Sequence, residues 1–390
     1  MSEFNKPNYK NNNIVNLMSS ISNNFNKVHD YNELTNLKSK DLKKYKNIIL
    51  IVIDGLGYNF LEKHKMSFLH KNLKSKLSST FPSTTACANT VYNVGYPPQQ
   101  SALTGWDMNL KEIGSVITIL PFVPYFGGSV LTNSNLDVSD FLDIKSFHKG
   151  FNCNCYSLLD KFIANSSFSN YTLSNTKVVP TDNYNDVFKK IEYLINTGNN
   201  NRQYIHAYFY ELDDLSHRFG VKSDKVKEIF NIFDNKIKEL RFKLKNTNTK
   251  IIVVADHGLI DTTRKSSLFL SDFTDLKACL TTSLSGEPRI RHCFVRPDKV
   301  KEFKHIIKTK LDQYCWCFKG TYLIKNNFFG LGVSHKKLYD RVGDYVLIFK
   351  ENYVLYDDLP NSNPKKKLIK GMHGGVSVEE MFVPLITIDC

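Results

Sequence analysis

Asn47-Ile-Ile-Leu-Ile-Val-Ile53 is the stretch that decides the fold of this 390-residue chain, and Asp54-Gly-Leu-Gly57 follows it directly. A continuous aliphatic run of this kind is typical of a strand that is buried on both faces, as in a parallel sheet. Open α/β sheets bind their ligands beyond the carboxyl ends of such strands. The stretch therefore predicts a parallel sheet with a ligand site that includes Asp54.

Helices and strands alternate along most of the remaining sequence, as expected of an α/β protein. We expect helices over residues 58–64, 85–94, 184–196, 223–244 and 299–311. We expect strands over residues 76–81, 204–210, 250–255, 290–295, 344–349 and 381–388. This alternation predicts a large sheet covered by helices.

Three stretches do not follow the alternation. Residues 1–46 form a polar lead-in with only modest apolar faces. This segment would either dock against the folded domain or stay unattached to it. Residues at about 127–181 and 262–288 lack clean periodicity, and we interpret them as cap insertions. A chain of 390 residues could hold two average domains, but large α/β enzymes often fold as one. We therefore predict one catalytic domain over residues 47–390 that contains both insertions.

The composition indicates a folded protein with a basic surface. With 42% hydrophobic residues, the chain can bury a sizeable core. Lysine plus arginine exceed aspartate plus glutamate by 52 − 38 = 14, which favours anionic partners such as nucleotides or phosphoesters. The basic clusters are short and dispersed, so we interpret them as solvated surface. No motif supports nucleic-acid binding.

Cysteine usage and the lack of long apolar segments favour the cytoplasm. The eight cysteines include two CxC pairs, which lack the CxxC spacing of a typical zinc site, so we expect reduced thiols. Residues 1–13 contain no apolar core of a secretory signal. No apolar run approaches the roughly 18 residues that a membrane span requires. We therefore expect a cytoplasmic protein without a membrane span.

Two further motifs follow strand-like runs. In Glu211-Leu-Asp213-Asp-Leu-Ser-His217, Asp213 and His217 are spaced so that one helical turn directs both at a single ion. Asp214 points about 100° around the same turn, and we interpret it as a cap or surface charge. Asp256-His257-Gly258 ends another aliphatic run, and its glycine leaves room for close approach to a metal.

Thr85 and His373 complete the set. Thr85 follows Pro82-Ser-Thr84 near a helix N-terminus, where free N–H groups and the helix dipole favour a phosphate oxygen. Gly371-Met-His373-Gly-Gly375 presents a histidine in a flexible turn. Each motif alone also has an ordinary explanation, such as a helix cap or a structural histidine. Together they are more specific, because two divalent ions need about three ligands each and a nucleophile beside them.

This ordered set of motifs resembles the alkaline phosphatase superfamily, and within it the type I phosphodiesterase/nucleotide pyrophosphatase branch. The resemblance covers most of the sequence from Ile48 to Ile388, with the lead-in and the two irregular stretches outside it. It also includes Gly286-Glu-Pro-Arg289 and Arg341-Val-Gly-Asp344, which are similar to bacterial members, and the closing segment Met381-Phe-Val-Pro-Leu385. It implies a three-layer α/β/α sandwich with a central, mostly parallel sheet and an inserted cap.

The resemblance further implies two divalent metal ions, usually zinc, with manganese as the other candidate. Three residues would hold the first ion beside the nucleophile Thr85 and three would hold the second: Asp54, Asp256 and His257, then Asp213, His217 and His373. Thr85 is expected rather than Thr84, because the family nucleophile is the last residue of its F-P-x-x-T pattern. Attack by Thr85 on phosphorus would give a phosphothreonine that water then hydrolyses.

One position departs from the family pattern. Nucleotide pyrophosphatases have an asparagine downstream of the nucleophile that helps hold a phosphoryl oxygen, and ungapped counting puts Trp106 there. Trp106 either stacks on a nucleobase or packs as an apolar anchor, and we favour packing. Arg289 or Arg291 would either neutralise phosphate charge or flank strands at the surface.

The sequence thus predicts a metal-dependent phosphodiesterase or nucleotide pyrophosphatase that acts on a small phosphoester or a nucleotide. One alternative is a phosphomonoesterase or phosphomutase of the same superfamily, although threonine in the FPSTT context favours diesters. The other alternative is a non-catalytic basic protein that binds nucleic acid or serves as a scaffold. A non-catalytic protein of this fold would lack some of the metal-binding residues, and none of them is missing here.

Overall fold

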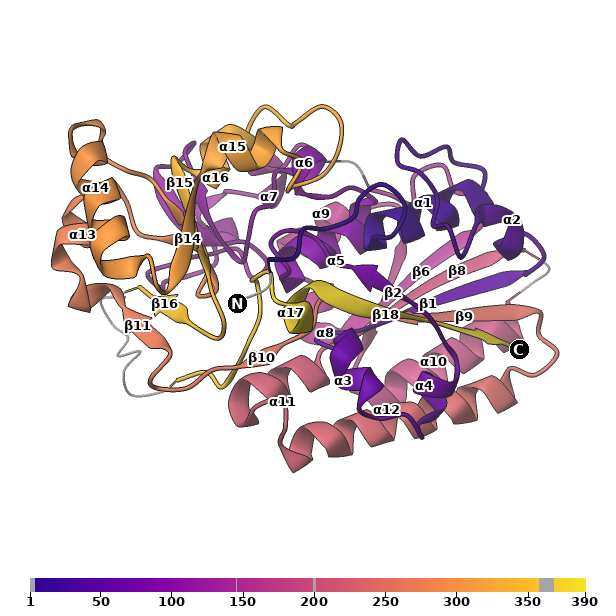
Figure 1. Cartoon of the computed structure of the whole chain (residues 1–390). Coiled ribbons are helices and arrows are strands. Elements are labelled where there is room, and N and C mark those ends of the chain that lie inside the picture. Colours follow the sequence, from indigo (N-terminus) through magenta and orange to yellow (C-terminus); the bar gives the residue numbers. More distant parts are fainter. Residues whose placement is uncertain (1–3, 145, 199–200, 358–367) are drawn as a thin grey trace.

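The computed structural model describes residues 4–144, 146–198, 201–357 and 368–390. A seven-stranded sheet forms its centre, in the order β2-β18-β9-β1-β8-β6-β7 (Figure 1). Five adjacent strands are parallel, and β18 is antiparallel to both of its neighbours. The strands are β1 (Asn47–Ile53), β2 (Leu73–Ser78), β6 (Asn154–Asp160), β7 (Lys177–Thr181), β8 (Gln203–Phe209), β9 (Thr249–Val254) and β18 (Phe382–Asp389).

The three central strands, β9, β1 and β8, explain why this sheet forms. Every residue of these strands is buried, as the continuous aliphatic runs predict. Their registers are aligned, with Ile53 opposite Phe209 and Val52 opposite Val254. The carboxyl ends of the three strands therefore meet at one edge of the sheet.

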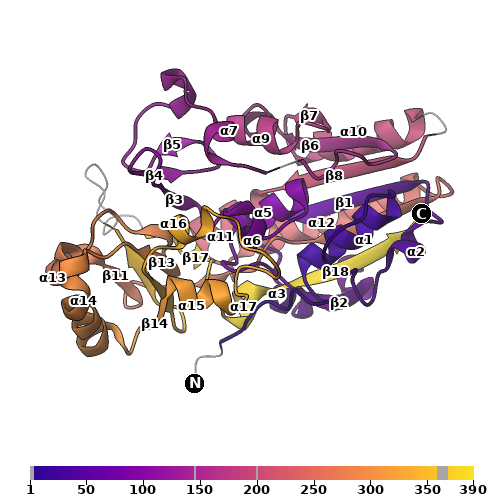
Figure 2. The same cartoon turned by 90° about the horizontal axis from the view of Figure 1, so that it is seen from above.

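Helices cover both faces of the central sheet (Figures 1 and 2). One face has α1 (Ile14–Asn24), α2 (Ser39–Leu42), α5 (Thr85–Val94) and α9 (Ser167–Thr172). The other face has α3 (Tyr58–Glu62), α4 (Phe68–Lys71), α10 (Tyr184–Thr197) and α12 (Asp224–Lys243). The predicted three-layer α/β/α sandwich with a mostly parallel sheet is thus confirmed.

A second seven-stranded sheet lies beside the first, and all of its neighbouring strands are antiparallel. Its order is β14-β15-β13-β12-β3-β4-β5. The strands are β3 (Asp107–Leu110), β4 (Ser115–Thr118), β5 (Val123–Pro124), β12 (Ser285–Glu287), β13 (Ile290–Cys293), β14 (Cys315–Lys319) and β15 (Tyr345–Phe349). We call this sheet and the helices around it the second lobe.

The helices of the second lobe are α13 (Thr274–Ala278), α14 (Val300–Ile306), α15 (Gly320–Lys325) and α16 (Leu338–Val342). The other helices are α6 (Pro98–Ser101), α7 (Val138–Phe141), α8 (Lys161–Ala164), α11 (Glu211–Phe219) and α17 (Val378–Met381). Four short turns of helix are η1 (Leu131–Ser134), η2 (Leu270–Asp272), η3 (Pro297–Lys299) and η4 (Ile307–Leu311). Two small ladders pair β10 (Ile260–Asp261) with β17 (Gly371–Met372) and β11 (Ser267–Phe269) with β16 (Val354–Tyr356).

The first irregular stretch differs from its interpretation as a cap, and the second stays a prediction. In residues 127–181, β6 and β7 belong to the central sheet rather than lying over it. Both are strands near its edge with exposed or half-buried positions, so neither has the continuous apolar run of a central strand. In residues 262–288, α13 and β12 belong to the second lobe, and β11 forms the small ladder with β16. The domain division itself stays a prediction.

The N-terminal stretch is docked against the sandwich. All but one residue of α1 are buried, and Asn13 caps this helix by accepting a hydrogen bond from Val15 N. The Asn13 Nδ2 also donates to the Ser79 carbonyl at 2.7 Å. Polar residues here are buried because their hydrogen bonds are satisfied within the fold.

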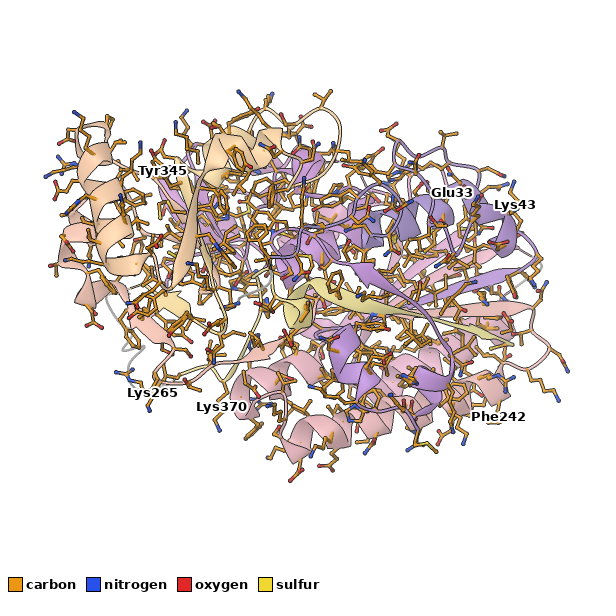
Figure 3. All side chains as sticks on the ribbon, in the orientation of Figure 1. Glu33, Lys43, Phe242, Lys265, Tyr345 and Lys370 are labelled. Atoms are coloured by element: carbon orange, nitrogen blue, oxygen red, sulfur yellow. The ribbon has the colours of Figure 1, made fainter. Side chains whose placement is uncertain are left out.

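The basic residues are spread over the surface. The exposed side chain of Lys43 lies at one end of the molecule, and those of Lys265 and Lys370 lie toward the other (Figure 3). This distribution agrees with the interpretation of the excess positive charge as solvated surface. Within the described ranges, we find no helix with both the length and the apolar character that crossing a membrane requires.

Candidate active site

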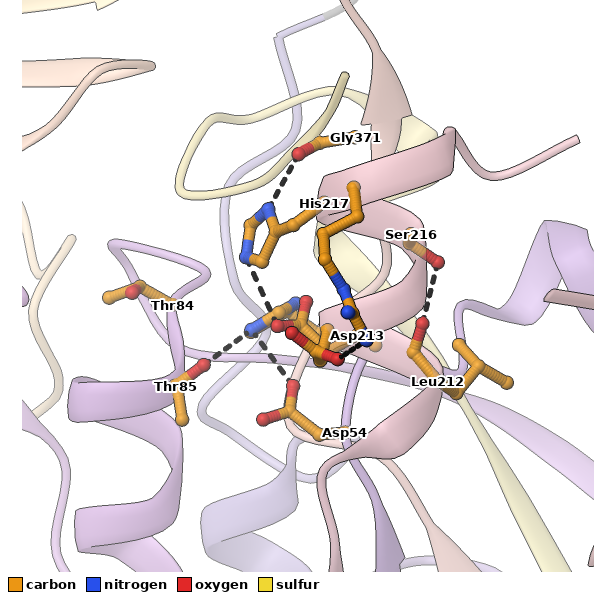
Figure 4. Close-up of polar contacts among 12 residues, drawn as sticks. Asp54, Thr84, Thr85, Leu212, Asp213, Ser216, His217 and Gly371 are labelled. Carbon is orange, nitrogen blue, oxygen red and sulfur yellow. Dashed lines mark hydrogen bonds and ion pairs between the residues drawn. The ribbon is translucent and has the colours of Figure 1, made fainter. Parts of the chain in front are cut away.

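The site forms where the aligned strands of the central sheet end. Asp54 follows β1, α11 begins two residues after the end of β8, and Asp256 lies two residues after β9. Thr85 is the first residue of α5, and His373 follows β17. These elements bring together all seven residues predicted from the sequence, several of which appear in Figure 4: Asp54, Thr85, Asp213, His217, Asp256, His257 and His373.

His257 lies at the centre of the first group. Its Nε2 is 3.0 Å from the Thr85 Oγ1, 3.4 Å from an Asp54 oxygen and 3.6 Å from an Asp256 oxygen. The other Asp256 oxygen accepts hydrogen bonds from the N–H groups of Gly55 and His257. These bonds fix the Asp256 carboxylate against the end of β1.

The second group lies on α11 and the loop after β17. The Nε2 of His217 is 3.0 Å from an Asp213 oxygen, and its Nδ1 is 2.6 Å from the Gly371 carbonyl (Figure 4). The ring of His373 stacks on that of His257 with centroids 3.8 Å apart. The His217 and His373 rings are 5.2 Å apart. The two groups are therefore in direct contact.

The electrostatics of the site favour a bound cation. Burial, together with the neighbouring Asp256 and Asp213 carboxylates, raises the pKa of Asp54 well above its ordinary value. Burial and the nearby His257 lower the pKa of His373, which keeps that imidazole neutral with a free lone pair. Although burial opposes its charged form, His217 has its pKa raised to about 9 by the Asp213 carboxylate. A positive charge among these acids would relieve their mutual repulsion.

The donor set contains candidate ligands for divalent metal. Two groups have ligand atoms within 4.8 Å of one another, and they share His257: Asp54, Asp256 and His257, and Asp213, His257 and His373. Four buried atoms have no hydrogen-bond partner among the described residues: Asp54 Oδ1, Asp213 Oδ1, Asp256 Oδ2 and His373 Nδ1. Buried carboxylate oxygens without partners are costly unless a metal or another cation binds them. Asp214, in contrast, pairs with Arg218, in agreement with its interpretation as a surface charge.

Two contributors to the site were not found from the sequence. Tyr208, within β8, donates a hydrogen bond to Asp54 Oδ2. Glu287, at the end of β12, accepts hydrogen bonds from the Thr84 hydroxyl at 2.5 Å and from the Trp106 N–H at 2.9 Å. The similarity of Gly286-Glu-Pro-Arg289 to bacterial family members drew attention to this segment, but nothing in the sequence assigned a role to Glu287.

A cavity of about 630 Å³ opens beside these groups. Its lining includes Thr85, His217 and His373 on the side of the central sheet, and Glu287 and Arg291 on the side of the second lobe. Trp106 also lines this cavity, and it packs against the apolar cluster around Met108. The packing role favoured from the sequence is therefore present, although the indole also borders the space for a substrate.

The two arginines considered from the sequence have different surroundings. Arg289 is 1% exposed, and its guanidinium makes a bidentate pair with Glu380 at 2.9 and 2.8 Å. This pairing excludes Arg289 from phosphate binding. Arg291 lines the cavity, and its Nη1 has no partner among the described residues.

The sandwich fold and this acid–imidazole cluster define a phosphoester hydrolase of the alkaline phosphatase superfamily. Residues 48–376 match the family model described as type I phosphodiesterase / nucleotide pyrophosphatase, and the chain belongs to this family. The resemblance inferred from the motifs is thereby confirmed, as is the assignment to hydrolases that act on phosphoric ester bonds. Among curated proteins, no sequence matches the chain.

Solved structures share the fold. Murine ectonucleotide pyrophosphatase/phosphodiesterase 5 superimposes with a TM-score of 0.65 at 16% identity, over 87% of each chain. The human counterpart gives a TM-score of 0.65 at 14% identity, also over 87% of each chain. Phosphonoacetate hydrolase from Sinorhizobium meliloti gives 0.61 at 14% identity, over 88% of this chain and 90% of its own. An inactive variant of the murine protein is in complex with AMP.

Proposed function

We propose that the chain is a metal-dependent phosphodiesterase or nucleotide pyrophosphatase that works through a phosphothreonine intermediate on Thr85. The observation that supports this most directly is the position of the Thr85 hydroxyl, 3.0 Å from His257 Nε2. His257 lies at the centre of the six proposed metal ligands, which we call the ligand set: Asp54, Asp213, His217, Asp256, His257 and His373. A nucleophile beside convergent carboxylates and imidazoles is the arrangement that phosphoryl transfer requires.

Six side chains would hold two ions, which we propose to be zinc, with manganese as the alternative. Asp54, Asp256 and His257 would hold the ion nearest Thr85, while Asp213, His217 and His373 would hold the other. When bound, the two ions would lower the pKa of the Thr85 hydroxyl and offset negative charge on the leaving oxygen. The partnerless buried atoms of Asp54, Asp213, Asp256 and His373 support this occupancy.

The proposed reaction has two steps. The Thr85 oxygen attacks phosphorus, an Oγ–P bond forms, the bond to the leaving oxygen breaks, and that oxygen receives the threonine proton. Water then attacks phosphorus, a new P–O bond forms, the Oγ–P bond breaks, and a proton from the water returns to the Thr85 oxygen. Free N–H groups in the first turn of α5 would stabilise the phosphoryl oxygens throughout.

The substrate we propose is a nucleotide or another small phosphodiester. Its support is the size of the cavity, about 630 Å³, which falls within the range for ligands of nucleotide size. The AMP complex of the murine relative gives further support. The net charge of +14 suits an anionic substrate.

The experiment that tests this proposal compares Thr85→Ala with Thr85→Ser. Turnover of bis(4-nitrophenyl) phosphate should fall by about 10³-fold or more in Thr85→Ala, because the nucleophile is removed. Thr85→Ser keeps a hydroxyl and should retain measurable turnover. Mass spectrometry of acid-quenched protein should find a phosphoryl group on the peptide that contains Thr85.

Full turnover in Thr85→Ala would reject the nucleophile assignment. A parallel assay with 4-nitrophenyl phosphate distinguishes a diesterase from a monoesterase. Faster hydrolysis of this monoester than of the diester would favour the phosphomonoesterase alternative.

We also propose a cytoplasmic location. It is supported by the cysteines, all eight of which are free thiols. Fractionation of cells that express the tagged protein would test this, and recovery in a secreted or organellar fraction would reject it.

A further inference from the structure

The wall of the cavity opposite the ligand set is built by the second lobe and its neighbouring ladder. Asp107 begins β3, Arg291 lies in β13, Tyr356 ends β16 and Asp357 follows it directly. All four residues line the same cavity as Thr85 and His217. We call these four residues the polar wall. The mechanism proposed above gives no task to any of them.

Two buried donors of the polar wall have no partner in the described chain. Arg291 is 2% exposed, and while its Nε donates to the Leu355 carbonyl at 2.9 Å, its Nη1 has no partner. Tyr356 is 8% exposed, and its hydroxyl also has no partner. Polar groups in native interiors are nearly always satisfied, so two such donors beside one cavity point to ligand atoms that accept hydrogen bonds.

The same wall also contains acceptors. Asp107 accepts a hydrogen bond from the Thr118 hydroxyl at 2.7 Å, and Asp357 accepts one from the Leu284 N–H at 2.9 Å. A carboxylate can accept about four hydrogen bonds, so these contacts do not prevent either group from accepting another. The wall therefore offers both donors and acceptors, and Asp107 and Arg291 lie opposite Gly286 from its two neighbouring strands.

This combination excludes several classes of substrate. A second phosphate would be repelled by the two carboxylates, and a quaternary ammonium group, which accepts no hydrogen bond, would satisfy neither donor. An alkyl chain would leave the Arg291 Nη1 and the Tyr356 hydroxyl without a hydrogen-bond partner. A hydroxyl group both donates and accepts, and adjacent hydroxyls match adjacent donors and acceptors.

We propose that the polar wall binds vicinal hydroxyls on the non-reacting part of the substrate, such as those of a sugar or a glycerol group. This inference rests on the proposed function only in that the reacting phosphate lies at Thr85. Arg291 and Tyr356 donate to the hydroxyl oxygens, and Asp107 and Asp357 accept the hydroxyl protons. The wall then determines which phosphoester is preferred, while the ligand set determines the chemistry.

A binding experiment tests this without depending on turnover. Isothermal titration of zinc-loaded Thr85→Ala protein would compare methyl phosphate with ribose 5-phosphate and glycerol 3-phosphate, which distinguish the two sources of vicinal hydroxyls. Phosphocholine and propane-1,3-bisphosphate supply the cationic and dianionic comparisons. At least one of the two hydroxyl-bearing esters should bind about tenfold more tightly than methyl phosphate, as expected for two or more new hydrogen bonds.

Variants locate this preference on the polar wall. Tyr356→Phe removes a single hydroxyl and should reduce the advantage of the hydroxyl-bearing ester about threefold or more, with methyl phosphate binding unchanged. Arg291→Met should reduce it further. The control is Tyr45→Phe, which removes a tyrosine hydroxyl bonded to Asp389 at the opposite end of β1 and should preserve the advantage.

Three results would overturn the inference. They are equal binding of methyl phosphate and both hydroxyl-bearing esters, tightest binding of phosphocholine or the bisphosphate, and an unchanged advantage in Tyr356→Phe. Absence of turnover by the wild-type protein would instead reject the proposed function. The binding result would still decide the inference, so the two failures are distinguishable.

Discussion

The two sheets contribute to the cavity in different ways. The parallel centre of the first sheet brings Asp54, Asp213 and Asp256 together simply because β1, β8 and β9 end in register. The second sheet is antiparallel and is assembled from residues 107–124 and 285–349. It contributes side chains from within or beside short strands, including Glu287 and Arg291. The comparison indicates that the first sheet supplies the chemistry and the second supplies recognition.

A buried ion pair joins the two sheets. Arg289 lies between β12 and β13 of the second lobe, and Glu380 lies in α17, which leads into β18 of the central sheet. Besides Arg289, the Glu380 carboxylate accepts hydrogen bonds from the Gly375 N–H at 2.9 Å and the Ser377 hydroxyl at 2.6 Å. Because Gly375 is two residues from His373, this pair also holds the loop that contains a proposed metal ligand.

Removal of metal should have the largest effect, and it tests whether the chemistry belongs to the central sheet alone. Dialysis against EDTA should reduce diester turnover by about 10³-fold or more, since the ions would supply several kcal/mol of transition-state stabilisation. Zinc or manganese should restore it. Circular dichroism should change little, because the core of the sheet does not include the ligand set. Full activity after exhaustive chelation would contradict this division.

Breaking the pair between the sheets should have the next largest effect. Arg289→Met leaves the fully buried Glu380 without its partner, which should lower the free energy of unfolding by about 3–5 kcal/mol. Arg296→Met is the matched control in the same lobe, because its pair with Asp298 is half exposed and should be worth about 0–1 kcal/mol. Urea denaturation measures both. Equal losses would show that burial of the first pair has no special importance.

A smaller effect concerns Glu287, where the two sheets meet beside the nucleophile. Burial raises the pKa of Glu287 to about 7, although the hydrogen bond from Thr84 opposes this. The unfolded chain therefore releases its proton first as pH rises, and stability from this group is present below about pH 4.5 and lost as pH rises through 7. Because the pKa of Glu287 rises from 4.5 to about 7 on folding, the loss should be on the order of 3 kcal/mol.

Glu287→Gln keeps an acceptor for Thr84 and Trp106. It should reduce the change in the free energy of unfolding between pH 5 and pH 8. Urea denaturation of chelated protein at pH 5 and pH 8 measures the difference. Glu302→Gln, at an exposed position, is the control and should leave the profile unchanged. Identical pH dependence in the wild type and in Glu287→Gln would contradict the assigned cause.

The sequence predicted the central sheet better than any other part of the fold. The strands β1, β8 and β9 are buried along their full length, so their aliphatic runs are visible without knowledge of neighbours. The edge strand β7 has an exposed first residue and only one buried position, and the polar residues of α1 are buried by partners distant in sequence. Such placements depend on tertiary contacts that a local pattern does not contain.

The same reasoning explains which site residues were found. Asp54, Asp213 and Asp256 follow recognisable strands within a few positions, so their convergence follows from the sheet itself. Tyr208 lies inside β8, so the sequence pattern does not distinguish it from other strand residues, although its hydroxyl donates a hydrogen bond to Asp54. Glu287 and Arg291 lie in strands of three and four residues, too short for a clear period.

The central claim is that distant segments assemble a two-metal centre around the Thr85 hydroxyl. The most direct test is a crystal structure of protein purified with zinc, with anomalous differences measured at the zinc edge. The account predicts two peaks, one bounded by Asp54, Asp256 and His257 next to Thr85, and one bounded by Asp213, His217 and His373. A single peak away from these residues, or none at full zinc loading, would contradict it.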